Sequence, residues 1–161
     1  KIIIEKTIFD VGVIYDLKIS YKGVPPVAEN PPWEGGITWS QSDDGYPWVG
    51  LSCQHEGAYI WFPCKEHPSD KPDSVDIFIT VPEPLKVASN GLLERIKDEK
   101  GKKETWHWKT TNPISTYNIN FTIGNFDIIN LQLIPAPLIS SGPKNSPILL
   151  ATTTAIIFFY P

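Results

Sequence analysis

Apolar and polar side chains alternate along three stretches of this chain. The longest runs from Val11 to Tyr21, and two shorter ones cover 75–81 and 117–123. Successive side chains of a β-strand point to opposite faces, so a period of two predicts strands that bury one face. No stretch repeats its apolar residues every 3.6 positions, which predicts little helix. We therefore expect an all-β fold, an antiparallel β-sandwich with a saddle-like exposed face.

Turn-forming and charged residues separate further strands. The Asp44-Gly45 step lies between two apolar stretches and predicts a β-hairpin over 37–51. The charged run 97–103 predicts the tip of a second hairpin over 92–109. The chain therefore folds largely through local strand pairs.

Tryptophans mark the expected core. Trp106 and Trp108 lie two positions apart, so they share one face of a strand while His107 points the other way. The segment 23–36 is rich in proline and glycine, which excludes regular structure, and we expect Trp33 to anchor this loop. Exposed tryptophans in a row would instead favour a carbohydrate-binding surface, but we expect most of them to be buried.

The amino-acid composition and net charge limit which kinds of partner the chain can bind. The chain of 161 residues carries a net charge of −4, with 14 Lys and Arg against 18 Asp and Glu, so nucleic acid is a poor candidate partner. It contains no Met and begins with Lys1, so we expect a fragment or a processed product whose compartment stays open. The uncharged run 148–160 is too short to span a membrane as a helix.

Charge also divides the chain. Lys144 is the only charged residue from 128 to 161. We expect residues 1–127 to form one β domain whose first strands are missing, followed by an uncharged tail over 128–161. This tail is interpreted either as a pair of buried strands or as a segment foreign to the fold.

The cysteines and histidines offer weak metal chemistry. Two cysteines do not make a disulfide framework for this length, so we expect Cys53 and Cys64 to be unbridged thiols. An alternative groups them with His55 and His67 as zinc ligands, but the spacings fit no common zinc pattern. The segment from His55 to Tyr59 begins like HExxH yet lacks the second histidine. We therefore expect no metal in this chain.

Three polar residues near the second cysteine invite a catalytic interpretation. Glu66, His67 and Asp70 could suggest acid and base chemistry. The surrounding prolines favour a rigid loop in which these side chains cap turns. We prefer the second interpretation.

Several landmarks together resemble a known family. They are Pro31-Pro-Trp-Glu-Gly-Gly-Ile-Thr-Trp, Trp61-Phe-Pro-Cys-Lys-Glu-His-Pro, Ile79-Thr-Val-Pro, Ser89-Asn-Gly, Trp106-His-Trp and Pro113-Ile-Ser-Thr-Tyr. The set, over about residues 11–126, resembles the N-terminal domain of the aminopeptidase N and leukotriene hydrolase family of zinc metallopeptidases, in a bacterial-type subgroup. Glu66 stands where that family usually has Asp. The zinc-binding HExxH and the substrate strand GxMEN of the family are absent here.

The resemblance implies a role for the end of one strand. In that family a Gln or Glu before the Phe-Pro-Cys segment helps bind the α-amino group of a peptide substrate. The matching residue is Gln54, with Glu56 as the second candidate. The resemblance further implies a non-catalytic domain that walls the active-site cleft and is inactive alone. Zinc would belong to a catalytic domain of the same polypeptide. The alternative is a free-standing β-sandwich that binds carbohydrate or protein.

Overall fold

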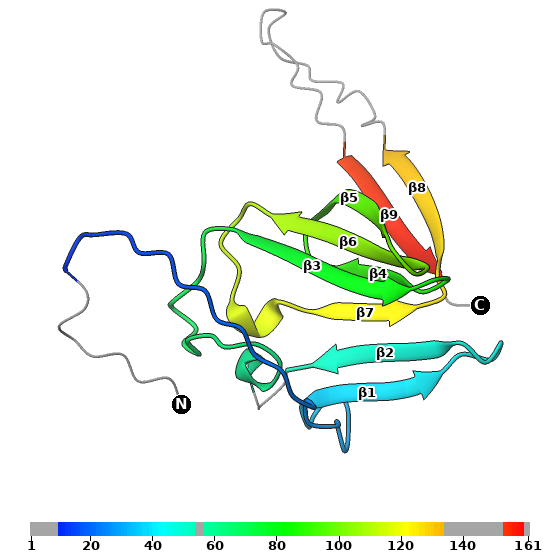
Figure 1. Cartoon of the computed structure of the whole chain (residues 1–161), viewed down its shortest axis with the longest axis horizontal. Coiled ribbons are helices and arrows are strands. Elements are labelled where there is room, and N and C mark those ends of the chain that lie inside the picture. Colours follow the sequence, from blue (N-terminus) through cyan, green and yellow to red (C-terminus); the bar gives the residue numbers. More distant parts are fainter. Residues whose placement is uncertain (1–9, 54–56, 134–152, 160–161) are drawn as a thin grey trace, which may run out of the picture.

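The computed structural model describes residues 10–53, 57–133 and 153–159, and in these parts the chain is built from antiparallel strands (Figure 1). One sheet has the order β1-β2-β7-β4 and another has the order β3-β6-β5. A third contains β8 and β9. The bounds are β1 Gly36–Gln41, β2 Pro47–Ser52, β3 Val75–Pro82, β4 Lys86–Ser89, β5 Leu92–Glu99, β6 Lys103–Thr110, β7 Phe121–Gly124, β8 Asp127–Leu133 and β9 Thr153–Phe159. Two 3-10 turns complete the set, η2 Ala58–Ile60 and η3 Thr116–Asn118. The all-β antiparallel expectation is confirmed.

The two larger sheets pack face to face over one apolar cluster. Trp106 and Trp108 of β6 are almost fully buried between Ile77 and Val81 of β3 and Val87 of β4. The Trp108 indole N–H donates to the Val87 carbonyl at 3.0 Å, which joins the sheets by a buried hydrogen bond. His107 points to the opposite face, as the alternation predicts.

A second cluster lies under the β1-β2 hairpin. Ile37, Val49, Leu51 and Cys53 are buried there together with Ala58 of η2. The turn of this hairpin is closed by a Ser42 N–H bond to the Tyr46 carbonyl at 2.9 Å, and Gly45 has a φ of 82°. The predicted Asp-Gly turn is therefore confirmed.

The segment Val11–Tyr21 is not a strand, contrary to the expectation from its alternation. It belongs to none of the three sheets (Figure 1). Its apolar side chains are largely exposed. An alternating pattern makes one face apolar, but a strand also needs a neighbour for its backbone groups. Within the described parts of the chain no strand pairs with this segment.

Two smaller expectations also fail. Trp33 is 61% exposed and does not anchor its loop, which is held by backbone bonds such as Ile37 N–H to the Pro26 carbonyl at 2.7 Å. The strand expected over 117–123 begins only at Phe121, because the chain first forms η3, where the Asn118 N–H bonds the Ser115 carbonyl at 2.8 Å. In both places backbone hydrogen bonds outweigh the apolar pattern.

Strands of the tail pair with one another. β8 and β9 are antiparallel, with Asp127 opposite Phe159 and Leu133 opposite Thr153. Ile128 packs against the cluster between the larger sheets. The division of the chain after residue 127 stays a prediction. Within the described residues, no helix is both long and apolar enough to cross a membrane.

Candidate functional site

The candidate site lies where β2 leaves its sheet. Leu51 is buried, and its carbonyl accepts a bond from the Asn120 side-chain amide at 2.9 Å. Cys53 is also buried, and its carbonyl accepts from the Gly57 N–H at 2.9 Å. The backbone on both sides of residues 54–56 is thus tied into the fold. The candidate residues Gln54 and Glu56, and also His55, lie outside the described residues.

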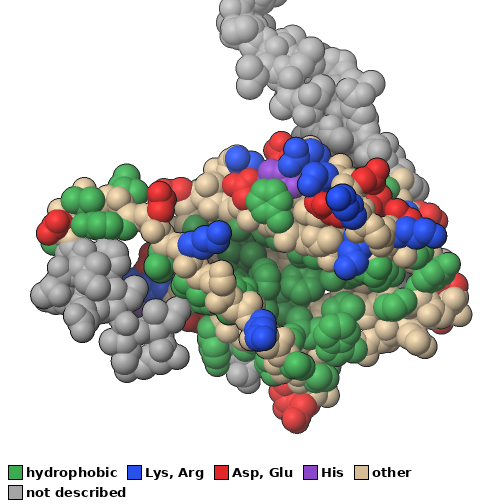
Figure 2. Space-filling model, viewed as in Figure 1, with side chains coloured by type: hydrophobic (Ala, Val, Ile, Leu, Met, Phe, Trp, Pro, Cys, Tyr) green, Lys and Arg blue, Asp and Glu red, His purple; other side chains and the backbone are tan. Residues whose placement is uncertain are grey.

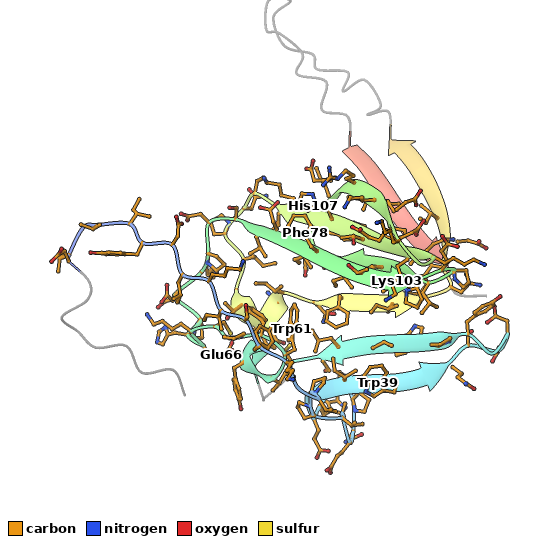
Figure 3. All side chains as sticks on the ribbon, viewed as in Figure 1. Trp39, Trp61, Glu66, Phe78, Lys103 and His107 are labelled. Carbon is orange, nitrogen blue, oxygen red and sulfur yellow. The ribbon has the colours of Figure 1, made fainter. Side chains whose placement is uncertain are left out.

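Glu66 binds the backbone that follows residues 54–56 (Figure 3). Its Oε2 accepts the N–H groups of Ala58 at 2.8 Å and Tyr59 at 3.3 Å, which are the free donors at the start of η2. Its Oε1 accepts the Thr116 hydroxyl at 3.1 Å. One carboxylate therefore connects η2 to η3, whose Thr116 lies 50 residues after Glu66 in the chain.

Gly57 makes room for this carboxylate. It has a φ of 88°, in the left-handed region that L side chains rarely adopt. A Cβ on it would lie 2.8–2.9 Å from the Cδ, Cγ and Oε2 atoms of Glu66. Both observations require glycine here. Sequence reasoning missed Gly57 and Thr116. An isolated glycine before an apolar stretch could have indicated Gly57. No feature of the sequence indicated Thr116.

The two thiols beside Glu66 are poor ligands and poor nucleophiles. Burial and then the Glu66 charge raise the pKa of Cys53 to about 11. The same causes, in the same order, raise the pKa of Cys64 to about 12. Both groups are free thiols and stay protonated at neutral pH, whereas metal binding and nucleophilic attack require the thiolate.

Two of the three polar residues of the proline loop, Glu66 and His67, accept backbone N–H groups at turns as expected, whereas Asp70 accepts none among the described residues. Besides Glu66, the Nδ1 atom of His67 lies 3.3 Å from the backbone N–H of Ser69, and Asp70 forms an ion pair with Lys65. The three former acid and base candidates engage different partners. The described part of the chain also contains no group of three or more His, Cys, Asp or Glu arranged to hold a metal ion.

An apolar groove of about 1160 Å³ lies beside the candidate site. Its lining comes from the segment 17–25 and from residues 59–65, together with Ile37 and Phe121. The Tyr21 hydroxyl donates to the Trp61 carbonyl at 3.0 Å and ties one side of the groove to the other. Figure 2 shows this hollow lined by hydrophobic side chains near the centre of the view. The groove can accept apolar side chains.

The tryptophans do not form the exposed row that a carbohydrate-binding module would need. Trp106 and Trp108 are buried, and Trp61 and Trp48 are half-buried. Trp61 packs edge-on against Phe121 at 5.2 Å. Only Trp33 and Trp39 are largely exposed. This distribution does not favour the binding-module alternative.

Comparison with known proteins identifies relatives of this domain. Residues 12–118 match the family model described as the peptidase M1 N-terminal domain. No curated protein is significantly similar.

Among solved structures, an M1 zinc metallopeptidase from Deinococcus radiodurans has a TM-score of 0.51 and 21% identity. A mutant of a two-domain M1 zinc metallopeptidase bound to L-arginine has a TM-score of 0.51 and 23% identity. A mutant bound to L-tryptophan has a TM-score of 0.50 and 22% identity. Each match covers 69% of this chain but only 24% of the solved chain. At these identities the comparison establishes a shared fold.

Proposed function

Because the chain belongs to the peptidase M1 N-terminal domain family, we propose that it is the non-catalytic N-terminal domain of a zinc aminopeptidase. It forms one wall of the active-site cleft, and Gln54 helps bind the substrate amino terminus. Zinc is held by a catalytic domain of the same polypeptide. The domain alone hydrolyses no peptide.

The anchored backbone on both sides of residues 54–56 is the observation that carries this proposal. The Cys53 carbonyl is bonded to the Gly57 N–H, and Glu66 holds the two amides that follow. The backbone that flanks Gln54 on both sides is therefore held in place, and anchored flanks lower the entropy lost when a side chain between them binds a ligand. Ligands with a free α-amino group fit the family, since two of the similar structures are bound to single amino acids.

The chemistry at Gln54 follows from the needs of an ammonium group. An ammonium has donors and no acceptor, so it requires carbonyl or carboxylate oxygens once water is removed. The amide oxygen of Gln54 supplies one acceptor, and carboxylates of the catalytic domain supply the others. Glu56 is the second candidate, three residues after Cys53.

The test uses the full polypeptide that carries this domain and its catalytic domain. Gln54→Ala should lower kcat/KM on a peptide with a free amino terminus by roughly 10- to 100-fold, the loss of one hydrogen bond to a charged group. Gln54→Glu keeps an acceptor and should lose less. Gln41→Ala, an exposed glutamine on β1, is the matched control and should be silent.

Peptides with a blocked amino terminus separate recognition from structure. They present no ammonium, so Gln54→Ala should leave their slow turnover unchanged. Equal losses on free and blocked peptides would refute the proposed contact.

A further inference from the structure

The outer face of the β3-β6-β5 sheet is basic, although the chain as a whole is acidic. Strand alternation places Arg95 and Lys97 of β5 and Lys103 and Lys109 of β6 on this face. Its carboxylates are Asp76 and Glu99, and the exposed Glu94 lies in the bulge of β5 next to Arg95. Asp98 and Glu104 are opposite each other on β5 and β6, at positions that alternate with these residues and therefore belong to the other face of the sheet. With neutral His107, the net charge of this basic face is about +1 when Glu94 is counted and about +2 without it, against −4 for the chain.

Two of the cations have no partner among the described residues. Lys97 pairs with Glu99 at 2.8 Å, and Lys109 lies 3.6 Å from Asp76. No side-chain bond or ion pair in the described parts involves Arg95 or Lys103, and both are exposed. Two positive charges are therefore available to an anionic ligand.

An aromatic pair stands on the same face. Phe78 and His107 lie directly opposite each other on β3 and β6, and their rings stack at 4.1 Å with an interplanar angle of 14°. The His107 Nε2 bonds Asp76 at 2.7 Å, which holds the imidazole in place. Phe78 is nevertheless 58% exposed, because β3 is the end strand of its sheet. A large apolar ring thus faces solvent on the same face as the free cations, separated from Arg95 by His107.

Figure 3 shows Phe78, His107 and Lys103 on the side of the sheet that faces the viewer, and Figure 2 shows Lys and Arg side chains around the histidine, interspersed with Asp and Glu. Arg95 lies opposite His107, and Lys103 is four residues from His107 along β6. Residues opposite one another on the three strands form a row across the sheet. At about 3.3 Å per residue, the row that contains Arg95 and the row that contains Lys103 are ~13 Å apart.

We propose that the basic face binds an extended acidic segment of a protein, with one apolar side chain on Phe78 and carboxylates on Arg95 and Lys103. Alternate residues of an extended peptide share a face, so two acidic residues four positions apart also lie ~13 Å apart. The spacing of the cations therefore matches two acidic residues four positions apart. Phe78 is in the row of Arg95, so an apolar residue midway between the acidic ones starts ~7 Å along the strands from Phe78, a distance that an aromatic side chain spans. A densely charged polymer would need a denser set of cations than this face offers.

The probe is the peptide acetyl-Thr-Glu-Thr-Phe-Thr-Glu-Thr-amide, labelled with a fluorophore and titrated with the whole chain. The expected result is binding that weakens about fivefold when salt is raised from about 50 to about 300 mM, since exposed charges are screened. The same peptide with Gln in place of Glu should bind at least about tenfold more weakly.

Variants assign this binding to the face. The double variant R95E/K103E should weaken binding about tenfold or more, because attraction becomes repulsion at both points. K18E/K71E is the control, because it changes the net charge equally at exposed lysines on other segments, and it should bind nearly as the parent does. Phe78→Ala should weaken binding of both peptides. Unchanged near-ultraviolet circular dichroism of the buried tryptophans would show that each variant folds.

Several results would overturn the proposal. They are no binding at ~1 mM protein, equal binding of the Glu and Gln peptides, or equal losses in the two double variants. A heparin hexasaccharide or an oligothymidylate that binds more tightly than the acidic peptide would assign the face to another class of polymer and would equally overturn it.

Discussion

The substitution Glu66→Ala removes the contact that holds the loop after β2. The carboxylate accepts from the N–H groups of Ala58 and Tyr59 and from the Thr116 hydroxyl, at 2.8, 3.3 and 3.1 Å. It also lies 3.5 Å from the Cys64 thiol. Alanine replaces none of these interactions, so η2 loses both its cap and its connection to η3.

The expected loss of stability follows from which of these groups water can reach. Ala58 is fully buried, so its amide is left without an acceptor, which costs about 1–3 kcal/mol. Tyr59 is exposed, and water can replace the carboxylate at its amide. The buried Thr116 hydroxyl can turn towards another acceptor, at about 0.5–1 kcal/mol. The free energy of unfolding should therefore fall by about 2–3 kcal/mol, a large part of the typical 5–15 kcal/mol.

Urea unfolding followed by tryptophan fluorescence measures this change. The midpoint should fall with an unchanged m-value, and Tm should fall by about 5–10 °C. Glu66→Gln keeps an acceptor oxygen and should lose about half as much. Glu34→Ala is the control, because Glu34 is exposed and makes no side-chain hydrogen bond or ion pair in the described residues. A loss below about 0.5 kcal/mol in Glu66→Ala, or an equal loss in Glu34→Ala, would refute the reasoning.

Three further predictions concern other parts of the chain. Gly91→Ala should destabilise the fold by about 2–4 kcal/mol, because φ is 89° and the added Cβ would lie 2.0 Å from the Lys109 carbonyl oxygen; an unchanged urea midpoint would contradict this. The Cys53 and Cys64 thiols should react slowly with dithionitrobenzoate in the folded chain at about pH 8 and faster as pH rises towards 11, since their raised pKa values keep them protonated. Denatured chain should release two equivalents at once, and equal rates in both states would be the contrary result. Truncation after Phe126 removes the contact of Ile128 with the cluster between the larger sheets, yet it should preserve cooperative unfolding and the near-ultraviolet tryptophan signal, because β8 and β9 hydrogen-bond only to each other among the described strands; gradual unfolding would count against it.

Local signals in the sequence predicted the parts of the fold that local interactions determine. The Asp44-Gly45 turn and the opposed faces of Trp106 and His107 were predicted correctly, because each depends on neighbouring residues in one hairpin. The segment Val11–Tyr21 was predicted wrongly, because alternation reports an apolar face and not the presence of a neighbouring strand. The prediction that Trp33 anchors its loop was also wrong, since a large apolar side chain does not have to be buried.

The candidate site was predictable only in part. The proline-rich setting of Glu66 indicated a capping role, and the structure confirms it. Its bond to Thr116 joins residues 50 positions apart, and no sequence pattern near either residue predicts that contact. Gln54 was identified through a family resemblance alone, and its role stays a prediction.

The pairing of β2 with β7 has a consequence for synthesis on the ribosome. Gly50 of β2 pairs with Thr122 of β7, so the β1-β2 hairpin acquires its inner neighbour only after 72 more residues have been made. At about 5–20 residues per second this takes roughly 4–14 s, much longer than the microseconds in which a hairpin closes. During that interval the cluster of Ile37, Val49 and Leu51 lacks the part of its cover that Phe121 and Ile123 of β7 provide. Nascent chains of this domain should therefore be clients of chaperones that bind exposed apolar strands, and slowed translation between β2 and β7 should increase aggregation.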